Sequence, residues 1–323
     1  MSDTEKPVKK KRRKPGDPPR PIGLAEKKAD GPAPAWFVPW EDSTASQLFE
    51  RFAFKNKYDR GDSDLSITQL INPPRVVALE KVHADALKQE ESTSILSILG
   101  SAVHKILEDG AGENHVTERR IFTVIDGVKI SGQMDLIVKV VSEGVVDIED
   151  YKVTSMYSVS NGPTPSWEKQ LNGYAGLLRM ALGVKVRNLR VHAVLRDYSK
   201  ARAPSWMTRP VVTLDIPRWT DDGQEVYLRQ QVKRHKDAQA KLLAGDTGIP
   251  ECSPYDTWDS PAAIHYYTET LNDYVMDRPI RCQNYCAVAD HCDQYGAFKI
   301  GFNLSAELAR QEAAKPAGQG QNP

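Results

Sequence analysis

Two carboxylates and one lysine mark a candidate site in the middle of this 323-residue chain. Asp135 ends the run that begins at Gly132, and Asp150 and Lys152 flank Tyr151. Carboxylate oxygens are hard ligands that hold divalent cations such as Mg²⁺ or Mn²⁺. A lysine beside such a cation can orient or help to deprotonate an attacking water. These residue types therefore predict metal-dependent hydrolysis of a phosphodiester bond.

Asp150 and Lys152 are predicted to project from the same face of a strand. Residues 144–151 are rich in Val and Ile, and side chains alternate along a strand, so Tyr151 and Glu149 point to the opposite face. Charges at the end of a buried strand are unfavourable unless they are paired or bound to a cation. An exposed strand edge with a cross-strand salt bridge is the alternative. We favour the catalytic interpretation.

Two predicted helices add polar side chains. His104 lies in residues 94–108, where apolar residues recur at helical spacing. A single histidine on such a face is more often a core or surface residue than a ligand. Gln170 and Tyr174 are four residues apart in the predicted helix 165–182 and share one face. An ordinary amphipathic helix is the alternative for this pair.

The ordered set of motifs resembles the PD-(D/E)XK nuclease superfamily. The likeness is to its RecB-like branch, which includes Cas4-type and AddB-type nucleases and phage exonucleases. That branch has Gly-x-x-x-His, Gly-x-x-Asp, Asp-x-Lys and Gln-x-x-x-Tyr in this order. The corresponding residues are Gly100 with His104, Gly132 with Asp135, Asp150 with Lys152, and Gln170 with Tyr174.

The resemblance implies a metal site and a metal-dependent deoxyribonuclease. Asp135, Asp150 and the backbone carbonyl of Tyr151 would hold Mg²⁺ or Mn²⁺, with His104 completing the site. An imidazole beside two carboxylates favours Mn²⁺ relative to a site made only of oxygens. The implied role is that of an exonuclease in recombination, repair or phage DNA metabolism.

Further residues receive roles from the same resemblance. Lys152 would orient the attacking water, and Gln170 and Tyr174 would contact DNA or orient the lysine. Glu118, near the start of the first predicted strand, is another candidate because related proteins often have Glu there. A solvated strand residue is an equally good interpretation of Glu118.

Four cysteines lie in the last quarter of the chain, at Cys252, Cys282, Cys286 and Cys292. This clustering favours thiolate ligation of a metal over disulfides in an intracellular chain. Cas4-like and AddB-like nucleases carry a [4Fe–4S] cluster on four cysteines, and the resemblance extends that cofactor to this chain. Their spacing and the position of their fourth cysteine differ from those here. A structural Zn²⁺ site, with His291 as a spare ligand, and unligated thiols are therefore alternatives.

The pattern of elements predicts an α/β fold with a mixed central β-sheet flanked by helices. Such a core is restriction-endonuclease-like, and a helical, cysteine-bearing C-terminal extension follows it. Asp126-Gly127 predicts a hairpin between the first two long strands. The predicted helices are 66–70, 75–87, 94–108, 165–182 and 218–243, and the predicted strands are 116–125, 128–140, 144–151, 189–195 and 211–216.

Charge and composition predict disordered ends around this core. Residues 1–20 carry eight basic and three acidic side chains, a net of +5, while the rest of the chain has a net of −5. The basic end could attract phosphates or remain a solvated arm. The predicted organisation is a disordered basic tail over 1–34, a nuclease core over 35–215, a helical and cysteine-bearing extension over 216–310, and a disordered tail over 311–323.

The composition as a whole is that of a globular protein, with 40% apolar and 27% charged residues. No run of about 18 apolar residues predicts a membrane span. The N-terminus lacks the apolar region of a secretory signal, so we expect an intracellular, cytoplasmic protein. DNA is the expected partner, and the sequence fits a monomer or a toroidal trimer.

Two other functional classes stay open. The first is a non-catalytic DNA-binding or assembly subunit that recruits a helicase or recombinase. Intact Asp135, Asp150 and Lys152 argue against it, because such a subunit has no physical need for all three. The second is an adaptor that uses the basic tail and the cluster of Trp36, Phe37 and Trp40.

Overall fold

The computed structural model describes residues 61–91, 95–244, 248–269 and 274–302. The predicted tails at 1–34 and 311–323 and the Trp36–Trp40 cluster lie outside the described residues. The chain divides into two compact units, with the division between Glu251 and Cys252. The unit that precedes this division contains the sheet, and the other contains the cysteines.

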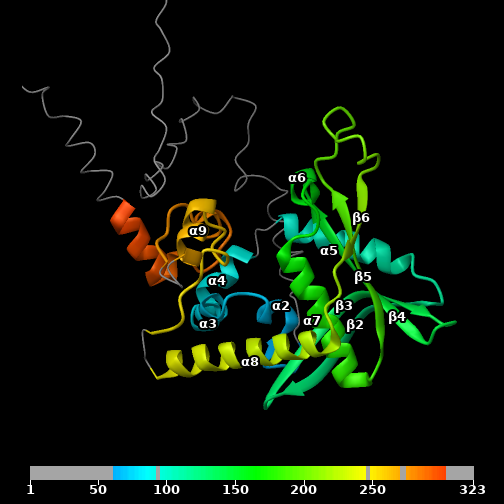
Figure 1. Cartoon of the computed structure of the whole chain (residues 1–323), viewed down its shortest axis with the longest axis horizontal. Helices are drawn as coiled ribbons and strands as arrows, with labels where there is room; N and C mark the ends of the chain where they lie inside the picture. The colour runs from blue at the N-terminus through cyan, green and yellow to red at the C-terminus, as the bar shows by residue number, and fades with distance from the viewer. Residues whose placement is uncertain (1–60, 92–94, 245–247, 270–273, 303–323) are drawn as a thin grey trace, which may run out of the picture. The chain divides into compact units, whose positions relative to one another are not determined.

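A six-stranded mixed sheet forms the centre of the first unit (Figure 1). Its path runs β1-β3-β4-β5-β6, and β2 also pairs with β3. The β1/β3 and β4/β5 pairs are parallel, and the other three pairs are antiparallel. The strands are β1 (Leu65–Ser66), β2 (His115–Ile125), β3 (Val128–Val140), β4 (Val145–Thr154), β5 (Val186–Leu195) and β6 (Val211–Ile216).

Strand β3 has a gap in its pairing that becomes important for the site. One edge of β3 pairs with β2 along almost its full length. The other edge pairs with β1 at Ile130 and Ser131 and with β4 from Leu136 to Val140. Between these two partners, residues 132–135 have no strand neighbour on that edge within the described chain. The sheet therefore opens at the level of Asp135.

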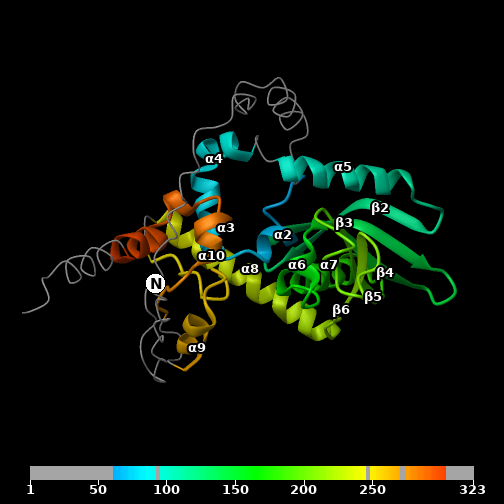
Figure 2. The same ribbon diagram turned by 90° about the horizontal axis from the view of Figure 1, so that it is seen from above.

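Helices cover the sheet from both sides. The helices of the first unit are α2 (Ile67–Leu70), α3 (Pro74–Val82), α4 (Ala84–Glu91), α5 (Ile95–Asp109), α6 (Met156–Val159), α7 (Pro165–Leu182) and α8 (Asp221–Leu243), and α3 packs mainly on α8. The view from above separates α5, on one side of the sheet, from α7 and α8 on the other (Figure 2). The second unit contains α9 (Pro261–Glu269), α10 (Ile280–Asn284) and a short 3₁₀ turn (Ala289–His291).

Helix α7 is the central helix of the apolar core. It begins where the Thr164 hydroxyl accepts the Trp167 N–H, and it ends at Gly183, whose φ of 67° is left-handed. Two glycines inside the helix allow close packing. A Cβ at Gly176 would lie 2.9 Å from Leu228 Cδ1, and one at Gly173 would lie 3.0 Å from Ile67 Cγ2. Helices α8 and α2 can therefore approach the backbone of α7.

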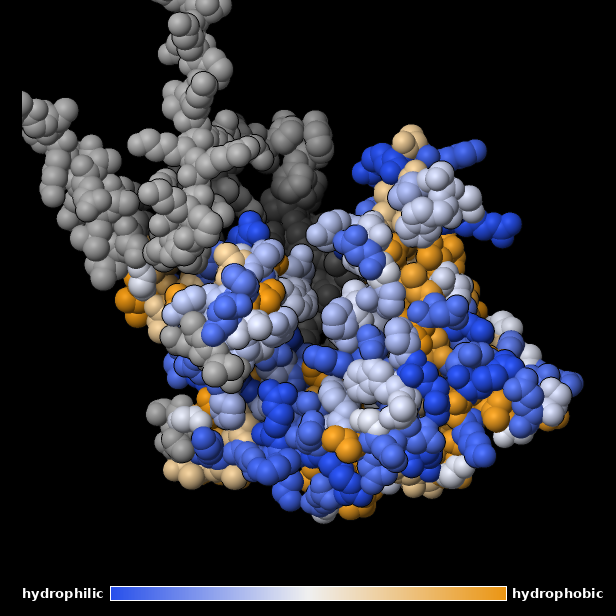
Figure 3. Space-filling model, in the orientation of Figure 1, coloured by the Kyte–Doolittle hydropathy of each residue, from blue (hydrophilic) through white to orange (hydrophobic). Residues whose placement is uncertain are grey.

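Helix α8 is polar on most of its surface and buries a single stripe. The buried residues recur at intervals of three or four and are Gln224, Leu228, Val232, His235 and Ala238. This spacing places them on one face of a helix. Hydrophilic residues cover most of the exposed surface in this part of the molecule (Figure 3).

The structure confirms the predicted fold class and corrects some details. The bounds of β3, α7 and β6 agree with the predicted ranges 128–140, 165–182 and 211–216. The single helix predicted over 75–87 is wrong, because the chain forms α3 and α4 with non-helical His83 between them. No glycine or proline marks this break in the sequence. None of the helices in the described part of the chain is long and apolar enough to cross a membrane.

Candidate active site

The carboxylate of Asp135 occupies the gap in the sheet. Strands β3 and β4 are last paired at Leu136 and Glu149. Beyond that pair the Tyr151 N–H donates to Oδ2 of Asp135, at 2.9 Å, in place of a backbone carbonyl. The side chain thus joins two strands that have begun to separate. Asp135 is buried, with 9% of its surface exposed.

His104 reaches the same point from helix α5. Its Nε2 atom lies 3.3 Å from the Tyr151 carbonyl oxygen and 3.6 Å from Oδ2 of Asp135. Its Nδ1 atom lies 3.4 Å from Oε1 of Glu118. The ligand atoms of His104, Glu118 and Asp135 all lie within 4.8 Å of one another. Imidazole nitrogen, carboxylate oxygens and a carbonyl oxygen thus converge, which is a donor set suited to a divalent transition metal.

Glu118 is held in an unusual backbone conformation. Its φ is +48°, although the residues on either side continue the pairing of β2 with β3. A non-glycine residue in this left-handed region is strained by about 1–2 kcal/mol. The Gln133 amide donates to Oε2 of Glu118 at 2.5 Å, and Arg120 donates in turn to Oε1 of Gln133. Gln133 and Arg120 carry no motif, so the sequence offered no signal for them.

Asp150 and Lys152 form a second group on the other side of β4. In the parallel register Asp150 lies beside Val191 and Lys152 beside Ala193, on the face that α7 covers. The Lys152 Nζ lies 2.5 Å from Oδ2 of Asp150. Asp150 is almost fully buried, with 1% of its surface exposed. The prediction that these two side chains share a face agrees with this arrangement.

Helix α7 supplies the polar partners of Asp150. The Gln170 amide nitrogen lies 3.3 Å from Oδ1 of Asp150 and 3.0 Å from the Tyr174 hydroxyl. Both α7 residues are buried. Of the predicted pair, Gln170 therefore contacts the carboxylate of the Asp150–Lys152 ion pair, and Tyr174 contacts Gln170 through its hydroxyl while its side chain belongs to the apolar core.

The burial of several charges perturbs their proton affinities. Burial, together with the negative charge of Asp150, raises the pKa of Asp135 to about 7. The hydrogen bond with Glu118 raises the pKa of His104, and burial opposes it. Burial alone would lower the pKa of Lys152, but the carboxylates of Asp150 and Asp135 outweigh it and the pKa is raised. Lys152 is therefore a cation at neutral pH.

The two groups meet through the peptide of Tyr151. Its N–H contacts Asp135 and its carbonyl contacts His104, while its chain neighbours Asp150 and Lys152 face α7. Asp150 does not belong to the set of ligand atoms within 4.8 Å, but its charge acts on both Asp135 and His104. The arrangement combines a candidate cation site with a half-buried lysine.

Gly132 has a packing role that explains its place three residues before Asp135. A Cβ at this position would lie 2.7 Å from Leu177 Cδ2 and 3.0 Å from Tyr174 Cδ1. Real side chains do not tolerate such distances, so only glycine lets α7 pack this close to β3. The glycine thus sets the distance between the strand of Asp135 and the helix of Tyr174.

The four cysteines lie in the second unit and form no disulfide. Cys252 is buried and the other three are half-buried. Burial raises the pKa of Cys252, and the thiols of Cys292 and Cys282 add to the shift. Burial and the thiols of Cys286 and Cys292 raise the pKa of Cys282 to about 12.

The backbone around Cys252 is fixed by one side chain. The Gln294 carbonyl oxygen accepts the Cys252 N–H, and its amide donates to the Cys252 carbonyl, each at 2.9 Å. This double contact joins the first cysteine to the segment that follows the last one. Within the described residues, no three cysteine sulfurs lie within 4.8 Å of one another.

Comparison with known proteins shows similarity at the level of the fold. No family model matches the sequence, and no curated protein sequence matches it. The crystal structure of SSO0001 aligns with a TM-score of 0.50 at 15% identity, over 78% of this chain and 98% of that chain. An alkaline exonuclease, LHK-Exo from Laribacter hongkongensis, aligns with a TM-score of 0.30 at 12% identity, over 62% and 97% of the two chains. The first of these alignments shows a shared fold.

Proposed function

We propose that this chain is a metal-dependent deoxyribonuclease that hydrolyses phosphodiester bonds. The observation that carries the proposal is the convergence of His104, Asp135 and the Tyr151 carbonyl beside the Asp150–Lys152 ion pair. A structural module has no need for two buried carboxylates and a half-buried lysine at a break in a sheet, because charged groups are unfavourable to bury.

The donor set fits Mn²⁺ or Mg²⁺. Asp135, His104 and the carbonyl of Tyr151 would hold the ion, with Glu118 close enough to join them and Asp150 adjacent. When bound, the ion would stabilise negative charge on the scissile phosphate. The imidazole favours Mn²⁺ relative to a site made only of oxygens.

Lys152 acts as a cation in this mechanism. Its raised pKa keeps the ammonium protonated at neutral pH, so it donates hydrogen bonds instead of accepting a proton. In that form it orients the attacking water or a phosphate oxygen, and Asp150 holds it in place at 2.5 Å. Gln170 in turn orients Asp150, and Tyr174 supports the amide of Gln170.

The substrate and the biological role follow from the motif resemblance. The ordered set from His104 to Tyr174 is that of RecB-like nucleases, and it supports DNA as substrate and exonuclease action in recombination, repair or phage DNA metabolism. A helicase or recombinase would act as partner. An intracellular location suits such a substrate.

The cysteines would hold a [4Fe–4S] cluster in the second unit. A tetrahedral Zn²⁺ with Zn–S distances of about 2.3 Å requires sulfurs only about 3.8 Å apart. The cysteine sulfurs do not form a group within 4.8 Å, so support for the cluster comes from the motif resemblance, and zinc stays the alternative. In this proposal Gln294 holds the Cys252 ligand in position.

A cleavage assay with matched variants tests the function. End-labelled linear and circular DNA, single- and double-stranded, would be incubated with Mn²⁺, Mg²⁺ or EDTA. The proteins are the wild type, Lys152→Ala, Asp135→Ala and, as a control, Lys139→Ala, which removes an exposed lysine of β3. Metal-dependent digestion of linear DNA only, lost in the first two variants and kept in the control, supports the proposal.

Other outcomes of the same assay contradict it. Equal activity in all four proteins would remove the catalytic assignment. DNA binding without cleavage in any of them would favour the alternative of a non-catalytic subunit that binds DNA and recruits a partner.

A further inference from the structure

The side chain of Tyr151 lies on the face of β4 opposite to Asp150 and Lys152. Its peptide group faces the proposed metal site, with the N–H on Asp135 and the carbonyl near His104. A carbonyl ligand cannot be adjusted by a side-chain rotation, because its direction is fixed by the backbone. The contacts that hold Tyr151 on its other side therefore help to set the orientation of this peptide.

Two imidazole rings contact the Tyr151 ring. His192, the direct neighbour of Tyr151 in the parallel register of β4 and β5, lies with its ring centre 5.6 Å away and tilted by 31°. His104 meets the same ring edge-on, with the ring centres 6.1 Å apart. The tyrosine ring thus lies between a candidate metal ligand and His192.

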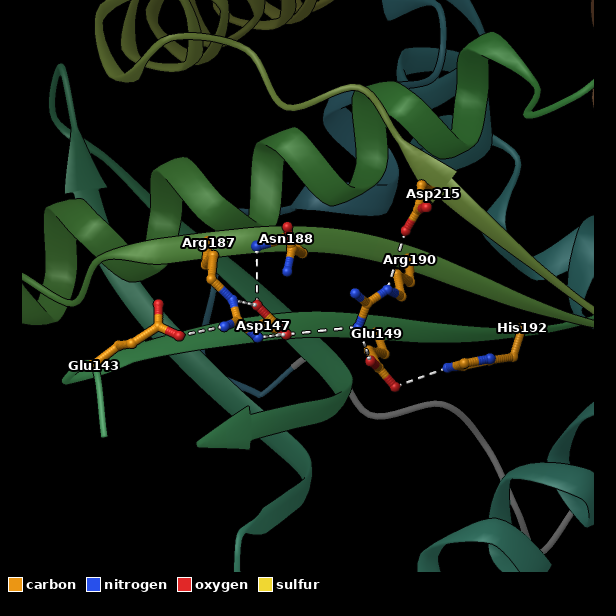
Figure 4. A network of polar contacts seen from close by, with 8 residues as sticks. All are labelled: Glu143, Asp147, Glu149, Arg187, Asn188, Arg190, His192 and Asp215. Carbon is orange, nitrogen blue, oxygen red and sulfur yellow. Dashed lines mark hydrogen bonds and ion pairs between the residues drawn. The ribbon is translucent and has the colours of Figure 1, made fainter. Parts of the chain in front are cut away.

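His192 is itself held by hydrogen bonds at both ring nitrogens. Its Nε2 lies 2.8 Å from Oε2 of Glu149, and its Nδ1 lies 2.9 Å from the Thr213 hydroxyl. Glu149 also accepts a hydrogen bond from Arg190 at 3.1 Å, and Arg190 contacts Asp215 on β6 at 3.1 Å. Figure 4 shows this network spread across β4, β5 and β6.

We propose that Glu149 and His192 are positioning residues for metal binding. They fix the ring of Tyr151 and so keep its carbonyl directed at the site that His104 and Asp135 form. Neither residue touches the metal or the substrate. The inference rests on the proposed function, since it concerns the same metal site, and it adds two residues that the motifs do not contain.

The physical basis is the freedom of the peptide. Strand β4 has left β3 at this level, so the Tyr151 peptide has β5 as its only strand neighbour among the described residues. Loss of the His192 ring would remove one of the two ring contacts of Tyr151. The peptide would then sample more orientations, and metal binding would have to order it. Mutation of residues that orient metal ligands in this way typically weakens metal affinity by about 10–100-fold.

The test is the affinity of the full chain for Mn²⁺, measured by titration calorimetry on DNA-free protein. His192→Ala and Glu149→Ala should weaken Mn²⁺ binding by about 10-fold. Glu149→Gln keeps an acceptor for His192, and it should remain within about 3-fold of the wild type. At saturating Mn²⁺ the cleavage rate of each variant should return close to the wild-type rate.

A neighbouring residue of the same network provides the control. Arg187 contacts Asp147 and Glu143 (Figure 4), and it lies on β5 five residues before His192, the residue whose ring contacts Tyr151. Arg187→Gln should lower the unfolding temperature without changing the Mn²⁺ affinity. This variant therefore distinguishes a loss of stability on this face of the sheet from a loss of Mn²⁺ affinity caused by a misplaced Tyr151 carbonyl.

Two results would count against the inference in distinguishable ways. If the wild type binds Mn²⁺ and His192→Ala lowers only the unfolding temperature, His192 and Glu149 are structural and the inference is overturned. If the wild type itself does not bind Mn²⁺, the proposed function fails together with the inference.

Discussion

The ammonium of Lys152 lies 2.5 Å from Oδ2 of Asp150, and Asp150 is almost fully buried. Lys152 thus lies beside two carboxylates, because Asp135 is buried close to the same pair, and His104 has a raised pKa next to them. Burial of like charges is unfavourable, and the raised pKa of Asp135 indicates that these basic groups compensate only part of it. A divalent cation would supply the missing positive charge.

Metal binding should therefore stabilise the folded chain. A ligand that binds only the folded state at about 100 times its Kd adds about 2.7 kcal/mol to the free energy of unfolding. We expect Mn²⁺ to raise the unfolding temperature, EDTA to reverse the rise, and Asp135→Asn to abolish it. Differential scanning fluorimetry measures this shift.

The control for this experiment is an exposed carboxylate outside the site. Asp109 at the end of α5 is 68% exposed in its side chain and pairs with Lys105. Asp109→Asn should keep the full Mn²⁺-induced shift. An equal loss of the shift in both variants would show that the stabilisation comes from non-specific binding.

His235 should make the stability of the first unit depend on pH. Burial lowers the pKa of this α8 residue from 6.5 to about 4, although its Nε2 contacts the Leu70 carbonyl at 3.4 Å. Between these two values the unfolded chain binds a proton that the folded chain does not. Stability is therefore lost as pH falls through this window, by about 2 kcal/mol at pH 5.

Urea unfolding at pH 7.5 and pH 5 measures this contribution. His235→Gln removes the titrating group, so the variant should lose about 2 kcal/mol less stability than the wild type between pH 7.5 and pH 5. The comparison is between the two proteins, since other groups titrate in both. If both proteins lose the same stability at pH 5, His235 is not the cause.

Much of the fold could be predicted because its signals are local. The strand that carries Asp135, the helix that carries Gln170 and the capping of that helix each have a periodicity or a terminal residue in the sequence. The break at His83 could not be predicted, because no local signal accompanies it. Tertiary packing, which decides such breaks, is not visible in a sequence window.

In the candidate site, too, some residues have a local sequence signal and others depend on tertiary contacts. The motif order identified Asp135, Asp150 and Lys152, and strand alternation placed the last two on one face. The contacts of Gln133 and His192 depend on strand register across segments that are distant in sequence. No spacing rule connects them, so they became visible only with the sheet assembled.

Gly132→Ala should destabilise the chain through overpacking. The added methyl would meet buried Leu177 and Tyr174, which have little room to move. Such insertions cost about 1–3 kcal/mol. Gly100→Ala is the matched control, because no atom lies within 4 Å of a Cβ there and the residue lies in helix α5.

Denaturant unfolding compares the two alanine variants. The control should be neutral or gain up to about 1 kcal/mol, since alanine favours the helix over glycine. A Gly132→Ala protein as stable as the wild type would show that α7 can move away from β3. In that case we expect reduced cleavage, since the Asp150 partners on α7 would shift as well.

The cysteines should bind iron in the purified protein. We expect iron, acid-labile sulfide and a visible absorption band when the protein is prepared without oxygen. Cys282→Ala should lose all three and unfold at lower temperature, because a structural metal contributes to folding. Thr268→Ala, an exposed change in the same unit, should retain them.

Metal analysis separates the alternatives for this cluster. Zinc without sulfide in the wild type would replace the iron–sulfur assignment. A wild-type protein that contains neither metal would leave the thiols unligated and contradict both.

At Glu118, backbone stability and the proposed function favour different residues. The left-handed backbone favours glycine, whereas the proposed metal site uses the glutamate carboxylate. Glycine there would relax the conformation, since it adopts positive φ without steric conflict. A chain selected only for thermal stability would therefore drift away from glutamate at this position. Variant libraries sorted for stability should enrich Glu118→Gly, and those sorted for DNA cleavage should deplete it. The residue found at position 118 would then show whether a library was selected for stability or for DNA cleavage.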